Sequence, residues 1–126
     1  MPRYSKSVLL VDDDPADRAL FGRDLTRLGF HVIQTGSVEE AMAAVVGGKI
    51  GCLVTDQMMS VSGQELASLA AGVRGDLGVV FLSGAFAPRE PIPPGAVFVQ
   101  KHDRTGLRSA VINCMKPWLI DSTFQE

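Results

Sequence analysis

The sequence predicts an α/β domain with three layers, in which helices cover both faces of a five-stranded parallel sheet. Three observations predict this fold. Short apolar runs recur along the chain, segments with helical spacing separate most of them, and four of the runs end at a residue with an ionisable or hydroxyl side chain. Right-handed crossovers leave few topologies for five such strands, and we expect the flavodoxin-like order 2-1-3-4-5.

Length and composition limit the possible classes of protein. The chain has 126 residues, 46% hydrophobic and 21% charged, which is typical of one globular domain. We expect that domain over residues 1–120, followed by a polar tail over 121–126. The formal net charge is −2 and no cluster of Lys and Arg is present, which argues against a nucleic-acid partner. No run approaches the ~18 apolar residues of a membrane span and no secretory signal is recognisable, so we expect a cytoplasmic protein without a membrane partner.

The first strand and helix have clear boundaries. Residues 8–11 form a continuous apolar run, which predicts a strand buried on both faces. Asp14 is a good N-cap and Pro15 suits the first helical position. Apolar residues at helical spacing extend this helix to Gly29, and a second strand follows over 30–34.

The second helix and third strand follow the same pattern. Ser37 and Glu40 have the spacing of a capping box, and the helix that they begin ends at the glycine pair 47–48. The third strand is predicted over 50–55 and leads directly into Asp56.

The region after the third strand contains the main irregularity of the sequence. A third helix is predicted over 64–71, and a fourth strand over 79–82 leads into Ser83. Residues 85–95 include four prolines, which exclude an ordinary helix because proline lacks the backbone N–H and clashes with the preceding turn. The fourth helix of the expected alternation is therefore replaced or shortened by a Pro-rich loop.

The last strand and helix complete the fold. The strand is predicted over 96–100 and leads into Lys101, and either Asp103 or Thr105 caps the helix, which Pro117 ends or kinks. The residues at helical spacing predict a buried stripe of Leu107, Ala110, Val111 and Cys114, and the sequence leaves open whether Trp118 joins it or contacts a partner. The two cysteines, Cys52 and Cys114, fall in predicted core elements, so we expect both to be buried and reduced.

The residues with chemical potential share one position in the fold, the carboxyl end of a strand. They are Asp12, Asp13, Asp56, Ser83 and Lys101. Because these strand ends form the ligand crevice of a doubly wound sheet, we expect the side chains to converge there. Crowded carboxylates favour a hard cation with oxygen ligands, Mg²⁺ or Mn²⁺. Carboxylate, cation, lysine and hydroxyl together are suited to binding a phosphoryl group.

Four segments give this pattern a family resemblance. They are VLLVDDDP at 8–15, LVTDQMM at 53–59 with Ser-Gly at 62–63, FLSG at 81–84 and GAVFVQK at 95–101. In this order, and each at a strand end, they resemble the receiver domains of response regulators in bacterial two-component systems, over about residues 7–116. The resemblance implies a signalling domain rather than an enzyme, with at most slow self-dephosphorylation.

The resemblance implies a role for each site residue. Asp56 would be the phosphoacceptor, which takes a phosphoryl group from a phosphohistidine on a sensor histidine kinase or phosphotransfer protein. Asp13 would bind Mg²⁺ directly, Asp12 partly through water, and Met58 through its backbone carbonyl; Asp56 would complete the metal site. Lys101 would pair with the phosphoryl group.

Two further residues match the positions at which receivers change conformation. Ser83 resembles the switch hydroxyl that turns toward the phosphoryl group, and Phe98 the aromatic residue that swings inward with it. A buried strand phenylalanine needs no switching role, so for Phe98 the structural interpretation stays open beside the functional one.

The sequence departs from the family at three places. Ser60 stands where a proline is usual, and Gly63 comes one residue early. His102 follows Lys101 where the family usually has a cis proline, and we predict a trans peptide because a cis non-proline bond costs about 3–4 kcal/mol. The Pro-rich loop cannot provide the usual helical surface, so we predict that the chain does not form the common dimer through the fourth helix, fifth strand and fifth helix.

Two other functions are compatible with parts of the pattern. The changed loops are also compatible with a receiver-like interaction module that phosphorylation does not switch. The second is a Mg²⁺-dependent hydrolase with an aspartyl-phosphate intermediate. Such an enzyme normally needs a second carboxylate two residues after the nucleophile, and Met58 at that position argues against this function.

Overall fold

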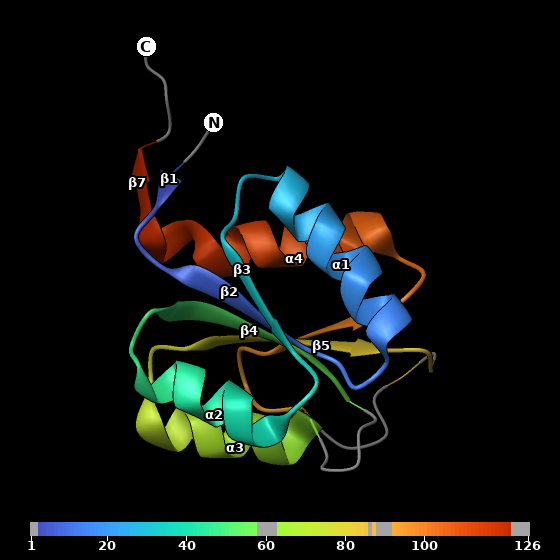
Figure 1. The fold of residues 1–126 in the computed structure, drawn as a ribbon, viewed down its shortest axis with the longest axis horizontal. Coiled ribbons are helices and arrows are strands. Elements are labelled where there is room, and N and C mark those ends of the chain that lie inside the picture. Colours follow the sequence, from blue (N-terminus) through green and yellow to red (C-terminus); the bar gives the residue numbers. More distant parts are fainter. Residues whose placement is uncertain (1–2, 58–62, 86, 88–91, 122–126) are drawn as a thin grey trace.

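A parallel sheet of five strands forms the centre of the computed structural model, which describes residues 3–57, 63–85, 87 and 92–121 (Figure 1). Its strands run in the order β3-β2-β4-β5-β6, and all neighbours are parallel. Counted along the chain this is the predicted order 2-1-3-4-5. The strands are β2 (Ser7–Val11), β3 (Val32–Thr35), β4 (Ile50–Asp56), β5 (Gly78–Ser83) and β6 (Val97–Gln100).

In the described part of the chain, two helices cover each face of the sheet. They are α1 (Pro15–Arg27), α2 (Val38–Val46), α3 (Gly63–Val73) and α4 (Arg104–Met115). Helices α1 and α4 lie on one face, and α2 and α3 on the other (Figure 1). Alternate residues of β2 enter the two cores: Val8 and Leu10 pack under α1 and α4, whereas Leu9 and Val11 pack under α2 and α3. This double burial explains why the strand has no polar face.

The helix caps agree in part with the sequence. Asp14 accepts hydrogen bonds from the N–H groups of Ala16 and Asp17, and Ser37 accepts one from the N–H of Glu40. The reciprocal half of the predicted capping box is absent from the hydrogen bonds of the described residues, because the Glu40 carboxylate instead accepts from the Thr35 hydroxyl.

Asp103, rather than Thr105, caps α4 by accepting from the N–H of Gly106 at 2.9 Å. The peptide bond between Lys101 and His102 is trans, as predicted. A 3₁₀ turn over Lys116–Trp118 follows α4, so the proline at position 117 coincides with the end of the α-helix.

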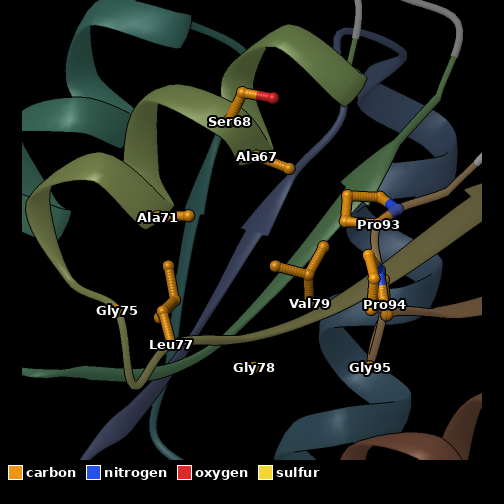
Figure 2. A pocket seen from close by; sticks show the side chains of 11 residues that line it. Ala67, Ser68, Ala71, Gly75, Leu77, Gly78, Val79, Pro93, Pro94 and Gly95 are labelled. Carbon is orange, nitrogen blue, oxygen red and sulfur yellow. The ribbon is translucent and has the colours of Figure 1, made fainter.

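No helix is present in the described part of the connection between β5 and β6, which comprises residues 84, 85, 87 and 92–96. This agrees with the predicted Pro-rich loop. A cavity of about 440 Å³ lies between α3 and this loop. Figure 2 shows Ala67 and Ala71 on one side of it, Pro93 and Pro94 on the other, and Val79 between them.

A second, two-stranded sheet has no counterpart among the predicted elements. Strands β1 (Arg3–Tyr4) and β7 (Leu119–Asp121) pair antiparallel at the two ends of the chain (Figure 1). Strand β7 includes the residue at which the predicted tail begins, and residues 122–126 lie outside the described part. Trp118 packs just before this strand, so closely against Gly51 that a side chain there would collide with the indole ring.

The two cysteines differ in burial, and both are free thiols. Cys52 is fully buried in β4, as predicted. Cys114 is only partly buried, so the prediction of burial is wrong for this residue, which lies where α4 packs over Gly78. Among the described residues, no helix has the length and hydrophobicity to cross a membrane.

Candidate functional site

Three aspartates meet at the carboxyl ends of two neighbouring strands. Asp12 and Asp13 directly follow β2, and Asp56 is the last residue of β4, which pairs with β2 through Val11 and Thr55. One carboxylate oxygen from each aspartate lies within 4.8 Å of those of the other two. The register of the parallel sheet therefore brings together residues that lie more than forty positions apart in the sequence.

Lys101 reaches this acidic cluster from the opposite side. Its Nζ lies 3.0 Å from Asp56 Oδ2 and 3.1 Å from Asp12 Oδ2. The residue follows β6, which is separated from β4 by β5, and its backbone N–H donates to the carbonyl of Ser83 at 2.8 Å. The long side chain spans the width of β5 and delivers a positive charge to the carboxylates.

Asp17 joins the site from α1 and was not identified in the sequence. Its Oδ2 lies 2.7 Å from Lys101 Nζ, which is shorter than either of the other two ion pairs of the ammonium group. Asp17 lies four residues after Asp13, about one helical turn further. That spacing was the available signal, but an acidic residue in the first turn of a helix is also explained by the helix dipole, so it did not stand out.

Asp12 is the most buried carboxylate of the site, with no exposed surface. Burial raises the pKa of Asp12, and the negative charge of Asp56 raises it further. The hydrogen bond from the Asp14 N–H and the positive charge of Lys101 lower the pKa, but burial outweighs them and the net pKa is raised. Although Lys101 Nζ is within ion-pair distance, Oδ2 has no hydrogen-bond partner among the described residues. This buried oxygen therefore has unused capacity as an acceptor or a ligand.

Lys101 stays protonated because of its three neighbours. Burial alone would lower the pKa of its ammonium group, but the hydrogen bonds and charges of Asp17, Asp56 and Asp12 outweigh burial and raise the pKa well above its ordinary value. Lys101 is consequently a permanent cation at the site over the physiological pH range.

The donor set fits a hard divalent cation. Among the described residues the site has four carboxylates, and in the ionised state their negative charge well exceeds the single positive charge of Lys101. Asp12, Asp13 and Asp56 offer only oxygen ligands, one of them the underused Asp12 Oδ2. Oxygen ligands and excess negative charge are the conditions under which Mg²⁺ binds to proteins.

Three predicted site residues remain, Ser83, Phe98 and Met58. Ser83 is fully buried at the end of β5, one residue beyond Leu82, which pairs with Asp56. Its hydroxyl accepts from the N–H of Ala85 at 3.0 Å. Phe98 lies in β6 opposite Phe81 and packs, half-buried, against the core under α2 and α3. The predicted carbonyl ligand at position 58 lies outside the described residues.

The chain returns very close to Asp56 after the loop. Gly63 donates its N–H to the carbonyl of Gln57 at 3.3 Å, and a Cβ on Gly63 would collide with the backbone oxygen of Asp56. The glycine at the start of α3 therefore allows a closer approach to the Asp56 backbone than a residue with a side chain would.

Solved structures of other proteins share the fold of this chain, although sequence comparisons find no match. Neither a family model nor a curated protein sequence matches the chain. A response regulator receiver protein from Sinorhizobium medicae WSM419 is 24% identical, with 88% of this chain and 94% of that chain covered and a TM-score of 0.77. The receiver domain of the hybrid histidine kinase CckA is 28% identical, with coverages of 87% and 99% and a TM-score of 0.74.

A third solved structure matches this chain over nearly the whole length of the other protein. The response regulator TrrA from Thermotoga maritima, in complex with Mg²⁺ and beryllofluoride, is 23% identical, with 86% of this chain and 98% of that chain covered and a TM-score of 0.75. These neighbours are receiver domains of response regulators, the family that the strand-end motifs of the sequence resemble. The chain therefore has the receiver-domain fold of response regulators.

Proposed function

We propose that this chain is a phosphoacceptor receiver, which takes a phosphoryl group from a phosphohistidine onto Asp56. The observation that carries the proposal is the position of the Asp56 carboxylate, 3.0 Å from the Lys101 ammonium and within reach of the Asp12 and Asp13 carboxylates. A structural carboxylate would not need this combination of a partly buried lysine and two further acids. The similarity to the TrrA structure, which was solved with Mg²⁺ and beryllofluoride, supports the same chemistry.

The transfer is a nucleophilic substitution at phosphorus. A carboxylate oxygen of Asp56 attacks, a new P–O bond forms and the P–N bond to the imidazole breaks. The electron pair of the P–N bond returns to the histidine nitrogen, which takes up a proton from water. The products are an aspartyl phosphate on this chain and an unmodified histidine on the kinase or phosphotransfer protein.

The residues around Asp56 would assist this step in two ways, by holding the metal ion and by supplying a positive charge. Asp12, Asp13 and Asp56 would hold Mg²⁺, with the backbone carbonyl of Met58 as a further ligand. The cation, when bound, neutralises negative charge on the phosphoryl oxygens. Lys101 offers a second, fixed positive charge to the same oxygens, and its raised pKa keeps that charge in place.

Signalling would follow from a rearrangement on the β5–β6 side of the site. The Ser83 hydroxyl now accepts from Ala85 N–H, so it has a hydrogen atom to donate to a phosphoryl oxygen if it turns. The backbones of Ser83 and Lys101 are hydrogen-bonded to each other, which links such a turn to the end of β6. The half-buried ring of Phe98 would swing inward when the Ser83 hydroxyl turns.

The test is phosphorylation by acetyl phosphate with Mg²⁺, followed by intact-protein mass spectrometry. We expect a mass gain of one phosphoryl group, which disappears in Asp56→Asn and persists in Asp76→Asn, a matched loss of an exposed carboxylate paired with Arg74. If acetyl phosphate leaves no phosphoryl group and beryllofluoride with Mg²⁺ does not bind, the proposal is wrong. The chain would then be a receiver-like interaction module that phosphorylation does not switch.

A further inference from the structure

We propose that Asp17 is a positioning residue that competes with the phosphoryl group for Lys101 and thereby opposes activation. The inference rests on the proposed phosphoacceptor function and concerns a residue outside the strand-end cluster. Its basis is the 2.7 Å ion pair between Asp17 Oδ2 and Lys101 Nζ, the shortest of the three that the ammonium makes with the described carboxylates.

The donors of Lys101 are already in use. An ammonium group has three protons and no acceptor, and here it hydrogen-bonds to Asp17 and Asp56 and lies in ion-pair contact with Asp12. A phosphoryl oxygen can gain a short contact with Lys101 only if one of these interactions weakens. Asp56 is the group that would carry the phosphoryl, and Asp12 would face the cation. Asp17 is therefore the carboxylate that competes with the phosphoryl group for the lysine.

Helix α1 holds Asp17 in this competing position. The Asp17 N–H points to the capping carboxylate of Asp14 at 3.4 Å, which fixes its backbone in the first turn. The positive end of the helix dipole favours a negative charge there. The Asp17 side chain is 33% exposed and that of Lys101 20%, so the pair lies at the rim of the site, where the lysine can move without unfolding the sheet.

The charge of Asp17 should have opposite effects on the two ligands of the site. It attracts a cation and repels an anionic phosphoryl group, in addition to holding the lysine. Removing the charge should strengthen binding of the phosphoryl mimic beryllofluoride and weaken binding of Mg²⁺ alone. A general disturbance of the structure would weaken both, so the opposed signs distinguish positioning from a structural role.

The experiment compares the full chain with Asp17→Asn, Asp17→Ala and the control Asp76→Asn by titration calorimetry. Circular dichroism and thermal unfolding establish that each variant is folded. Mg²⁺ is titrated alone, and beryllofluoride is titrated at Mg²⁺ concentrations that saturate every variant. We expect beryllofluoride to bind about fivefold more tightly to Asp17→Ala, the upper range for a partly exposed ion pair. Asp17→Asn should lie between it and the unaltered chain, because an amide still accepts a hydrogen bond without the charge.

Other outcomes separate this inference from the proposed function. If the unaltered chain binds beryllofluoride and both Asp17 variants bind it equally or more weakly, the role of Asp17 is wrong and the phosphoacceptor proposal stands. If neither the unaltered chain nor any variant binds it, the phosphoacceptor proposal fails and the inference with it.

Discussion

Gly63 packs against Asp56 so tightly that a Cβ atom on the glycine would collide with the carbonyl oxygen of the aspartate. The contact joins the first residue of α3 to the last residue of β4, and so restricts the backbone of the proposed phosphoacceptor. Gly63 is therefore a structural part of the site although it has no side chain to contribute.

Replacing Gly63 by alanine should destabilise the protein by roughly 1–3 kcal/mol, because the clash is with backbone and cannot be relieved by a rotamer change. Gly72→Ala is the matched control in the same helix, since a Cβ at that position meets no atom within 4 Å. The control should be neutral or slightly stabilising. Urea unfolding of both variants measures the difference, and equal stabilities would show that the contact at Gly63 relaxes freely.

Asp13 should be needed for the cation, whereas Asp14 should not. Asp13 belongs to the carboxylate cluster, and Asp14 caps α1. Asp13→Asn should weaken Mg²⁺ binding at least about tenfold, since even the loss of an outer partner of a metal ligand commonly has this effect. Asp14→Asn preserves the cap and should bind Mg²⁺ nearly as well. Calorimetric titration of Mg²⁺ into both variants tests this, and the reverse order of affinities would disprove the assignment.

Asp14 should contribute to folding through its two N-cap hydrogen bonds. Its Oδ1 accepts from the N–H of Ala16 at 2.9 Å and from that of Asp17 at 3.4 Å. Asp14→Ala should lower the free energy of unfolding by about 1 kcal/mol. Asp14→Asn, an equally good cap, should retain it in chemical denaturation. Acetyl phosphate should still label Asp56 in both variants.

The ion pair between Asp24 and Arg104 predicts a pH-dependent part of stability. The buried Asp24 carboxylate accepts two 2.6 Å hydrogen bonds from the guanidinium, which hold the pKa of Asp24 below its ordinary value of 3.8. A lowered folded-state pKa gives stability that is present above 3.8 and lost as the pH falls through the folded-state value.

Arg104→Ala should accordingly lower Tm at pH 7, and this difference from the unaltered chain should shrink steadily in acid below pH 3.8. Asp76→Asn, which removes the charge of an exposed carboxylate paired with Arg74, should change Tm little. Thermal unfolding followed by circular dichroism from neutral to acid pH gives both curves. A difference that stays constant over the whole range would mean that the charge of Asp24 is not responsible.

Association provides a test of the unusual connection between β5 and β6. Because its described residues form no helix, we expect no dimer through that surface even when beryllofluoride and Mg²⁺ occupy the site. Sedimentation velocity over a range of concentrations should show a monomer with and without them. A beryllofluoride-dependent dimer that mutations on β6 or α4 disrupt would contradict the expectation.

Much of the fold could be predicted from local sequence, because its signals act over a few residues. The apolar run at 8–11 needs only its own composition to indicate a doubly buried strand, and Asp14 with Pro15 needs only its neighbours to begin a helix. Conversely, the pairing of β1 with β7 joins opposite ends of the chain. Two short strands without a periodic pattern carry no local signal, so that sheet could not be predicted.

The candidate site divides in the same way. Short-range hydrophobic patterning is enough to recognise strand ends, so Asp12, Asp13, Asp56 and Lys101 could be placed there without coordinates. Which carboxylates Lys101 reaches is known only from the folded chain, in which its side chain crosses β5 to Asp56 and shares its charge with Asp17. That choice depends on the rotation of α1 over the sheet and on the path of a long side chain. Both are set by packing between elements distant in sequence, which no local pattern encodes.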